Sequence, residues 1–280
     1  MSTFVKNREM VTVSIVCYKT EVGELGRCLD SLQSAAVGRI YVVDNSSEAY
    51  LRDYCATRGV EYMASANVGY GAGHNQAIRC AAAAGSRYHL VLNSDVEFTP
   101  ATIDRIVEYM DAHADVGLLQ PRVLNTDGSL QSTCRLLPTP FDLVLRRFLP
   151  DWLCRRRRRR YTLADYDHRT PLDVAYLQGS FLFFRLADLM EIGLFDERFF
   201  MYPEDIDISR RMTRRSRVLY FPEVEIVHAH RAESYRSAKM RRIHIENMIR
   251  YFNKWGWVFD AERRRLNREV LHQAPKTSRK

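Results

Sequence analysis

Four places in the sequence hold side chains that can bind a metal or move a proton. They are Asp44, Asn93–Asp95, Glu204–Asp205 and the histidine pair His228 and His230. Ligands bind beyond the carboxyl ends of the strands in an open α/β sheet, so these groups can converge if they follow strands of one sheet. Convergent carboxylates and an imidazole suit a divalent cation that holds a diphosphate, such as Mg²⁺ or Mn²⁺, with one further carboxylate left as a base.

Each of these groups also has a purely structural explanation. Asn93–Asp95 is typical of a turn, and Ser94 or Asp95 could cap the helix expected to begin near Pro100. Pro203 suits the start of a helix, and the two carboxylates after it would lie in a first turn where the helix dipole favours them. Either histidine could be a hydrogen-bonded residue at the end of a strand.

A cluster of glycines lies between the third expected strand and an alanine-rich helix. Gly69, Gly71 and Gly73 let a ligand approach the backbone closely, at a helix N-terminus whose N–H groups can bind an anion. The cluster is not the dinucleotide-binding fingerprint, because it follows the third strand rather than the first and its spacing differs. A tight turn followed by a helix cap is the structural alternative.

The first half of the chain alternates apolar strands with helices of helical apolar spacing. Strands are expected over 11–17, 39–43, 60–63 and 88–92, and helices over 21–34, 48–58, from the glycine cluster to about 84, and over 100–112. This alternation predicts βαβ units with right-handed crossovers, and therefore a mostly parallel central sheet flanked by helices.

The second half of the chain is less regular. Strands are expected over 116–124, 174–184, 218–221 and 224–227, and helices over 186–192, from 203 and from 235 onward. Residues 136–172, with several prolines and an apolar helix candidate over 141–149, are interpreted as a partly flexible insertion at the rim. We expect a catalytic domain over residues 1–230 that includes this insertion, and a basic helical extension over residues 231–280.

Length and composition restrict the class of protein. A chain of 280 residues, 46% of them hydrophobic, can form one large domain or one domain with an appendage. No apolar run approaches the ~18–20 residues needed to cross a bilayer, and the first residues lack the apolar core of a secretory signal. Six scattered cysteines without metal-binding spacing indicate buried free thiols and a reducing, cytoplasmic compartment.

The net charge of +8 is concentrated in arginine-rich segments, and the longest is the unbroken run Arg155–Arg160. Such clusters attract a polyanion, either nucleic acid or an anionic membrane surface. Nucleic acid is disfavoured because the arginines are not interleaved with aromatic residues and no nucleic-acid-binding motif is present. Apolar residues beside the run, such as Phe141 and Trp152, would complete an interfacial patch, but a solvated loop and a helix packed on the core are alternatives.

Seven stretches, taken in order, resemble the inverting glycosyltransferases of family 2, and among these the bacterial rhamnosyltransferase-like members. The stretches are Val13–Tyr18, Val42–Ser47, Asn67–Asn75, Leu92–Asp95, Gln178–Phe181, Gly193–Glu197 and Phe199–Asp207. The resemblance covers about residues 10–255. It implies the GT-A fold, an α/β fold of nucleotide-diphospho-sugar transferases, here with a C-terminal helical extension.

The resemblance implies a role for each matching residue of the donor site. Asp44 would accept hydrogen bonds from the pyrimidine base of a nucleotide sugar, and Asn67 and Gly69 would line the nucleotide pocket. Asn93–Asp95 stands in the place of the family's Asp-x-Asp metal motif. Because the first position is asparagine here, the resemblance implies Asp95 as the main metal ligand and its neighbour Asn93 as a weaker ribose or phosphate contact.

The resemblance also implies the catalytic residues. Asp205 matches the general base and Glu204 its partner, while His228 matches a histidine that completes the metal site in relatives. His230 is close enough in sequence to take that place instead. The implied cofactor is Mg²⁺ or Mn²⁺. The base would take the proton of an acceptor hydroxyl as a nucleoside diphosphate leaves, in a single displacement that inverts the anomeric carbon.

The implied donor is dTDP-rhamnose, with a UDP-hexose as the alternative, and the implied acceptor is a saccharide linked to polyprenyl diphosphate in cell-envelope polysaccharide synthesis. The basic segments would then hold a cytoplasmic enzyme at the anionic inner face of the cell membrane. Two other classes stay open. A nucleotidyltransferase would need a glycine-rich basic loop after the first strand, where the chain has Tyr18–Gly23. A non-catalytic polyanion-binding protein would bind in a salt-sensitive manner and ignore nucleotide sugars and Mg²⁺.

Overall fold

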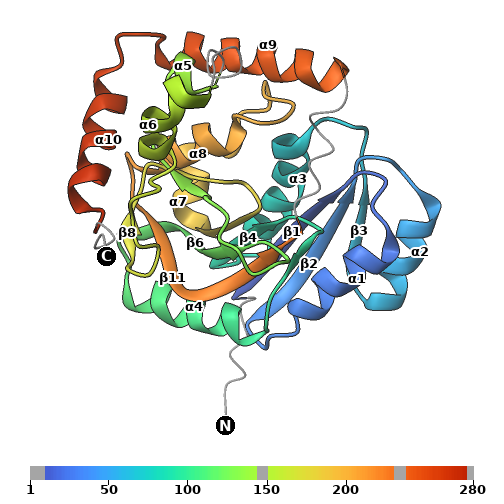
Figure 1. The fold of residues 1–280 in the computed structure, drawn as a ribbon. Helices are drawn as coiled ribbons and strands as arrows, with labels where there is room; N and C mark the ends of the chain where they lie inside the picture. The colour runs from blue at the N-terminus through green and yellow to red at the C-terminus, as the bar shows by residue number, and fades with distance from the viewer. Residues whose placement is uncertain (1–9, 144–150, 230–237, 276–280) are drawn as a thin grey trace.

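A central sheet lies between two layers of helices in the computed structural model, which describes residues 10–143, 151–229 and 238–275 (Figure 1). In these residues eight strands follow the order β3-β2-β1-β4-β10-β6-β11-β5, and a ninth, β8, pairs with β11. Their bounds are β1 (Val11–Cys17), β2 (Val37–Asp44), β3 (Glu61–Ala64), β4 (Tyr88–Leu92), β5 (Val96–Glu97), β6 (Val116–Leu124), β8 (Leu172–Asp173), β10 (Phe181–Arg185) and β11 (Arg217–His228). A separate two-stranded sheet pairs β7 (Cys134–Arg135) with β9 (Tyr176–Leu177).

Strands β3, β2, β1 and β4 run parallel to one another, which confirms the βαβ units predicted from the sequence. Beyond β4 the sheet is mixed, because β10 is antiparallel to both β4 and β6, whereas β6 and β11 are parallel. The antiparallel strand β10 begins at the edge where β4 ends, since Phe181 pairs with Leu92. The turn before β10 therefore lies beside the residues that follow β4.

Helices cover both faces of the sheet. They are α1 (Val22–Ser31), α2 (Ala49–Arg58), α3 (Tyr70–Ala83), α4 (Ala101–Ala112), α7 (Leu186–Ile192) and α8 (Glu204–Met212). One apolar cluster joins α1, α2 and α4 to one face through residues such as Leu25 and Ile103. A second cluster joins α3, α7 and α8 to the other face through residues such as Ile78 and Ile208. The strands supply both clusters because successive side chains point to opposite faces.

Residues 136–172 contain more helix than the sequence analysis expected. Helix α5 (Pro140–Leu143) begins the helix candidate expected over 141–149, whose remainder lies outside the described residues from 144 onward. The arginine run is not a loop, because it lies within α6 (Asp151–Tyr161). This helix buries Cys154 and Tyr161 against the protein and leaves all six arginines exposed.

Two strand predictions need correction. The strand expected over 174–184 is two short strands, β9 and β10, separated by the turn at residues 178–180. The strands expected over 218–221 and 224–227 are one strand, β11, whose pairing with β6 shifts register between Phe221 and Glu225. The three extra residues 222–224 bend the strand without ending it, and a sequence pattern does not distinguish the two outcomes.

Two C-terminal helices, α9 (Ala238–Trp255) and α10 (Ala261–Gln273), pack beside α8. A third apolar cluster joins them to it, with Tyr251 and Phe252 from α9, Leu266 from α10 and Ile206 from α8. None of the helices within the described ranges is long and apolar enough to span a bilayer.

Buried charges also connect the C-terminal helices to α8. Arg210 donates to the two carboxylate oxygens of Asp260 at 2.7 and 2.6 Å, and each of these side chains is only 2% exposed. Asp207 accepts a hydrogen bond from Trp255 Nε1 at 2.8 Å and pairs with Lys254 Nζ at 2.6 Å. These contacts anchor the helix whose first turn carries two of the predicted site residues. The division into a catalytic domain and an extension near residue 230 stays a prediction.

Candidate active site

The end of β4, the turn before β10 and the start of α8 meet at one edge of the sheet. Asn93 N donates to Ser180 O at 3.0 Å, which joins the residue after β4 to that turn. Gly179 N, in the same turn, donates to Asp205 Oδ2 at 3.0 Å. The fold therefore brings Asn93–Asp95 and Glu204–Asp205 to the same site, although about a hundred residues separate them.

Tyr70, the first residue of α3, joins the two halves of this site. Its hydroxyl lies 2.9 Å from Asn93 Oδ1 and 2.7 Å from Gly179 O, so it can donate to either acceptor. Desolvation raises the pKa of Tyr70 well above its usual value, and the charges of Glu204, Asp205 and Asp95 raise it further. The negative charges of three predicted site carboxylates thus all disfavour ionisation of the Tyr70 hydroxyl.

Asp205 is a buried carboxylate with few hydrogen-bond donors. Its Oδ2 accepts from Gly179 N and from the Tyr176 hydroxyl at 3.3 Å, and its Oδ1 accepts from Ile206 N at 2.8 Å. Burial raises the pKa of Asp205 to about 7, although these backbone donors and the charge of Arg135 oppose the shift. A general base works best when its pKa lies near the operating pH, and this carboxylate meets that condition.

Glu204 lies beside Asp205 and is also buried. Within the described residues its Oε2 has no hydrogen-bond partner. Burial raises the pKa of Glu204 well above its usual value, and the charge of Asp205 raises it further. A buried oxygen without a partner is unusual in folded proteins and points to an interaction that forms with a ligand.

His228, the last residue of β11, faces the residues that follow β4. Its Nε2 lies 3.3 Å from Asp95 Oδ1 and 3.4 Å from Asn93 Nδ2. Its Nδ1 lies 3.0 Å from Gln131 Oε1, while Gln131 Nε2 donates to His228 O at 2.7 Å. This amide orientation assigns a proton to Nδ1, and in the neutral imidazole it leaves the Nε2 lone pair directed at the Asp95 carboxylate.

An imidazole lone pair and a carboxylate oxygen that face each other suit a shared cation. Within the described residues no group of three His, Cys, Asp or Glu side chains could hold a metal. Two protein ligands nevertheless fit Mg²⁺ or Mn²⁺ at a site where phosphates and waters supply the other oxygens. The hydrogen bond from Gln131 fixes the ring in the tautomer that ligation requires. His230, the other candidate, lies outside the described residues.

Of the two structural explanations of Asn93–Asp95, the turn is observed and the helix cap is not. Ser94 Oγ donates to Glu24 Oε1 at 2.6 Å, Asp95 faces His228, and α4 has no side-chain cap. A turn does form there, but its side chains point to other elements rather than to the helix that follows.

Asp44, at the end of β2, is fully buried and satisfied by the protein itself. Its Oδ1 accepts from Ser46 N and Oγ, and its Oδ2 accepts from Glu48 N and the Tyr62 hydroxyl, all at 2.6–2.9 Å. Burial alone would raise the pKa of Asp44, but these donors outweigh it and the pKa is lowered. Direct contact between Asp44 and the pyrimidine base of a nucleotide sugar, as the resemblance implies, would require that one of these donors be replaced. This role of Asp44 therefore stays a prediction.

The glycine cluster packs closely against other parts of the protein. Gly69 has a φ of 99°, and a Cβ there would lie 2.3 Å from Phe200 O. A Cβ at Gly71 would lie 2.8 Å from the Phe195 side chain, and one at Gly73 would lie 2.9 Å from Val16. Close packing therefore accounts for all three glycines. Asn67 is exposed beside them, and its predicted place in a nucleotide pocket, like that of Gly69, stays a prediction.

The sequence analysis missed three residues that shape this site: Tyr70, Gln131 and Tyr176. Tyr70 was part of a matching stretch but was given no role. Gln131 and Tyr176 reach the site only because β11 and α8 pass beside them, so no local pattern could identify them.

The chain belongs to glycosyl transferase family 2, because the model of that family matches residues 12–193. Family membership confirms the enzyme class expected from the sequence and argues against a nucleotidyltransferase or a non-catalytic protein. The fold also resembles that of GalNAc-T7 solved with UDP, GalNAc and Mn²⁺, with a TM-score of 0.64 and 14% identity over 89% of this chain and 48% of the other. An identity that low supports the fold alone, and it confirms the GT-A fold.

Two curated relatives are rhamnosyltransferases. The N-acetylglucosaminyl-diphospho-decaprenol L-rhamnosyltransferase of Mycobacterium tuberculosis is 31% identical over 184 residues, which are 60% of this chain and 58% of that protein. Rhamnosyltransferase WbbL of Escherichia coli K12 is 26% identical over 223 residues, 76% of this chain and 81% of that protein. The matched region thus spans little more than half the length of the mycobacterial relative.

Proposed function

We propose that the chain is an inverting glycosyltransferase that moves a sugar from a nucleotide-sugar donor to a saccharide carried on polyprenyl diphosphate, in cell-envelope polysaccharide synthesis. The observation that carries the proposal is the Asp205 carboxylate, whose raised pKa suits a general base. It lies across Tyr70 from Asn93, Asp95 and His228. A single displacement needs one general base for the acceptor hydroxyl and one group that binds the leaving diphosphate.

In this mechanism Asp205 accepts a hydrogen bond from the acceptor hydroxyl and takes its proton as the oxygen bonds to the anomeric carbon. The bond from that carbon to the diphosphate breaks in the same step, so the configuration inverts and the proton stays on Asp205. No covalent glycosyl-enzyme forms, and a single base therefore suffices. Glu204 supplies a second buried carboxyl beside the base, where it can bind the acceptor.

Asp95 and His228 are the residues that would hold Mg²⁺ or Mn²⁺, with Asn93 as a weaker contact to phosphate or ribose. The metal would neutralise negative charge on the leaving diphosphate. Gln131 orients the His228 ring, and Tyr70 keeps the Asn93 amide in place opposite the base.

The favoured donor is dTDP-rhamnose, since two relatives carry rhamnosyltransferase names, and a UDP-hexose is the alternative. The lipid-linked acceptor is supported by the printed name of the mycobacterial relative, which includes a diphospho-decaprenol. Such an acceptor is bound to a membrane. We therefore propose that the enzyme works peripherally at the anionic inner face of the cell membrane, where its basic surface would be attracted.

The test combines a ligand panel with one variant. Each nucleotide sugar, with and without Mg²⁺ or Mn²⁺, is added to the protein and the melting temperature is measured. A donor at ~100 times its Kd adds about 2.7 kcal/mol of stability, which is easily detected. A metal-dependent shift with dTDP-rhamnose supports that donor, whereas a shift with UDP-sugars alone replaces it.

Asp205→Asn is then expected to keep the donor-dependent shift and to lower turnover by roughly 10²–10⁴-fold, the usual contribution of a general base. If this variant retained turnover close to that of the wild type, Asp205 would not be the base. The absence of a shift with every nucleotide, in a protein that also shows no transfer to any lipid-linked acceptor, would oppose the transferase proposal as a whole.

A further inference from the structure

A groove between α6 and α10 is lined by positive charge and by no acidic residue of the described chain. Its volume is about 490 Å³. The lining residues are Thr139, Arg160, Val258, Arg263, Arg264, Asn267, Arg268, Leu271 and His272. Figure 1 shows the two helices side by side. Four guanidinium groups and an imidazole therefore line one cavity.

Two of these arginines are available to a ligand. Arg263 is buried, and the Asp260 carboxylate that lies 3.8 Å from its Nη1 is already held by Arg210. Arg160 and Arg268 are exposed, and within the described residues neither has an ion pair or a side-chain hydrogen bond. The positive charge of these two side chains is directed to whatever occupies the groove.

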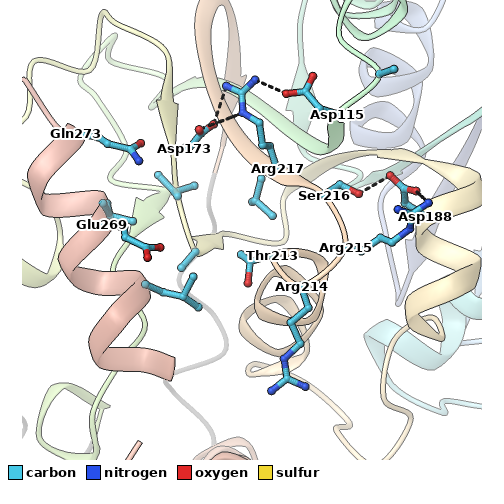
Figure 2. Close-up of a pocket in the computed structure, with 16 residues that line it drawn as sticks. Asp115, Asp173, Asp188, Thr213, Arg214, Arg215, Ser216, Arg217, Glu269 and Gln273 are labelled. Carbon is cyan, nitrogen blue, oxygen red and sulfur yellow. Dashed lines mark hydrogen bonds and ion pairs between the residues drawn. The ribbon is translucent and has the colours of Figure 1, made fainter. Parts of the chain in front are cut away.

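A second cavity, of about 480 Å³ between α10 and the start of β11, gives a contrast (Figure 2). There Arg217 pairs with Asp115 and Asp173 at 2.9 Å each, and Arg215 pairs with Asp188 at 3.3 Å. Two of its three arginines are therefore matched by carboxylates within the cavity, and the third, Arg214, pairs with Glu262 outside it. The α6–α10 groove has no such match, and so it can attract an anion from outside the protein.

The basic surface extends along α6. A neighbouring cavity of about 640 Å³ shares Arg160 and Leu271 with the groove, and it is lined by Leu153 and by three further arginines of α6. Four arginines of the run thus adjoin the arginines of α10 in one basic surface, in which Arg157 pairs with Asp142 and Arg159 with Asp165. Opposite charge on a partner would be attracted over an area much wider than a single ion site.

Exposed apolar side chains border this surface at both ends. In the loop between α9 and α10, Val258 is 64% exposed and Phe259 is 89% exposed. On α6, Trp152 is 76% exposed and Leu153 is 53% exposed. Basic residues flanked by exposed aromatic and aliphatic residues are typical of surfaces that lie in the headgroup region of a membrane.

We propose that α6, α10 and the loop between α9 and α10 dock on an anionic lipid bilayer, with a phospholipid phosphate held in the groove by Arg160 and Arg268. Guanidinium groups bind phosphate oxygens through paired N–H donors. Phe259 and Trp152 enter the boundary between headgroups and acyl chains. Aliphatic Leu153 and Val258 gain free energy in hydrocarbon but have no ring on which a base could stack, which favours a bilayer over a nucleic acid.

This proposal locates the membrane contact of the proposed function and stands whether or not the chain transfers a sugar. The test is flotation of the full chain with phosphatidylcholine vesicles that contain one-third phosphatidylglycerol, without donor or metal. Wild-type protein binds these vesicles and not pure phosphatidylcholine. Arg160→Gln with Arg268→Gln weakens binding about 30-fold, because each basic residue at an anionic surface contributes ~1 kcal/mol. Phe259→Ser weakens the part of the binding that high salt does not screen.

The matched control is Arg87→Gln with Arg105→Gln, which removes the same charge from an exposed and a half-buried arginine that are paired elsewhere and leaves binding unchanged. Equal losses in both double variants would overturn the proposal, because net charge alone would then explain binding. Equal binding to pure phosphatidylcholine would overturn it too. A third outcome would also overturn it: the protein does not bind anionic vesicles, but it binds inorganic diphosphate or an oligonucleotide, and that binding requires Arg160 and Arg268. The substituted side chains are exposed or half-buried, and the control breaks only surface ion pairs, so melting temperatures close to that of the wild type are expected.

Discussion

Asp44 and Asp205 are buried carboxylates at the same edge of one sheet, yet their surroundings shift their pKa values in opposite directions. Asp44 accepts four hydrogen bonds at 2.6–2.9 Å, two on each oxygen, and its pKa is lowered. Asp205 accepts three, one of them from the adjacent backbone N–H, and its pKa is raised to about 7. Desolvation is stronger at Asp205 and its donors are fewer, so burial outweighs the hydrogen bonds there, whereas at Asp44 the hydrogen bonds outweigh burial.

This difference separates a carboxylate that the protein itself satisfies from the carboxylate that we propose as the base. The four donors of Asp44 hold the loop after β2 in place and leave no oxygen exposed to a ligand. The carboxylate of Asp205, with Glu204 beside it, keeps acceptor capacity that the protein does not use. Burial without enough donors destabilises the charged form, and that cost is tolerated where a base is needed.

The strongest test of the comparison is the pH dependence of Asp205. Its folded pKa lies above the unfolded value of about 4, so the folded state binds more protons between pH 4 and 7. Stability should therefore fall across this range as pH rises, on the order of 2–4 kcal/mol in urea titrations. Over the same range kcat/KM should rise to a plateau above about pH 7, because only the carboxylate can accept a proton.

Asp205→Asn provides the control for this prediction. The amide does not titrate, so the fall in stability from pH 5 to pH 7.5 should become much shallower in the variant. A slope equal to that of the wild type would mean that another group, such as Glu204, causes the pH dependence. The two titrations would then have to be separated with Glu204→Gln.

Asp44→Asn should have the opposite outcome. An amide has one acceptor oxygen, so either Ser46 N or Glu48 N would face an NH₂ group and lose its hydrogen bond. A buried donor left without an acceptor costs about 1–3 kcal/mol, and we expect urea denaturation to show about 2 kcal/mol of destabilisation at pH 7. The wild-type contribution of Asp44 should vanish at low pH, since its stabilising charge is lost as pH falls through its lowered pKa.

Full stability in Asp44→Asn, together with a large loss of nucleotide affinity, would contradict this assignment. It would indicate that the Asp44 carboxylate binds the pyrimidine base when the nucleotide sugar is bound, as the resemblance to the family implies. The comparison between the two carboxylates would then be one between two ligand-binding groups.

Gln131→Leu tests whether the proposed metal-binding side of the site also depends on a hydrogen bond supplied by the protein. The change removes the acceptor that holds the proton on His228 Nδ1. Partners of this kind typically alter metal affinity by 10–100-fold, and we expect about a tenfold higher Mn²⁺ concentration at half-maximal stabilisation by nucleotide. Gln131→Glu keeps an acceptor and should restore most of the affinity. Equal affinities in all three proteins would exclude an orienting role for Gln131.

The sequence predicted the first half of the fold well because its strands and helices are local patterns. Strand Val11–Cys17 and the end of helix α2 at Gly59, whose φ is 66°, follow directly from apolar runs and glycine chemistry. The arginine run failed as a guide to structure, because helix α6 is stabilised by burying Cys154 and Tyr161 rather than by its charged residues. Tertiary packing of two side chains there outweighed the composition of the whole segment.

The site was predicted only in part, for a different physical reason. Residues at strand and helix ends, such as Asp95 and Asp205, are marked by their position in the chain. The pKa of each carboxylate is not marked in this way, because it depends on hydrogen-bond donors from distant segments. These donors are Tyr62 for Asp44, and Gly179 and Tyr176 for Asp205. Sequence alone therefore found the carboxylates but could not distinguish the satisfied one from the proposed base.

The smallest predicted effect concerns Tyr70, which links the base side of the site to the metal side. Tyr70→Phe leaves Asn93 Oδ1 and Gly179 O without this donor, and the turn that donates to Asp205 becomes less firmly held. A lost hydrogen bond of about 1 kcal/mol corresponds to roughly a fivefold decrease in kcat. Tyr176→Phe is the matched variant, because its hydroxyl contacts Asp205 Oδ2 directly. It should raise the pKa seen in the pH profile of kcat/KM, whereas Tyr70→Phe should lower kcat and leave that pKa in place. A shift of the profile in Tyr70→Phe instead would assign Tyr70 to the environment of the base rather than to the link between the two sides.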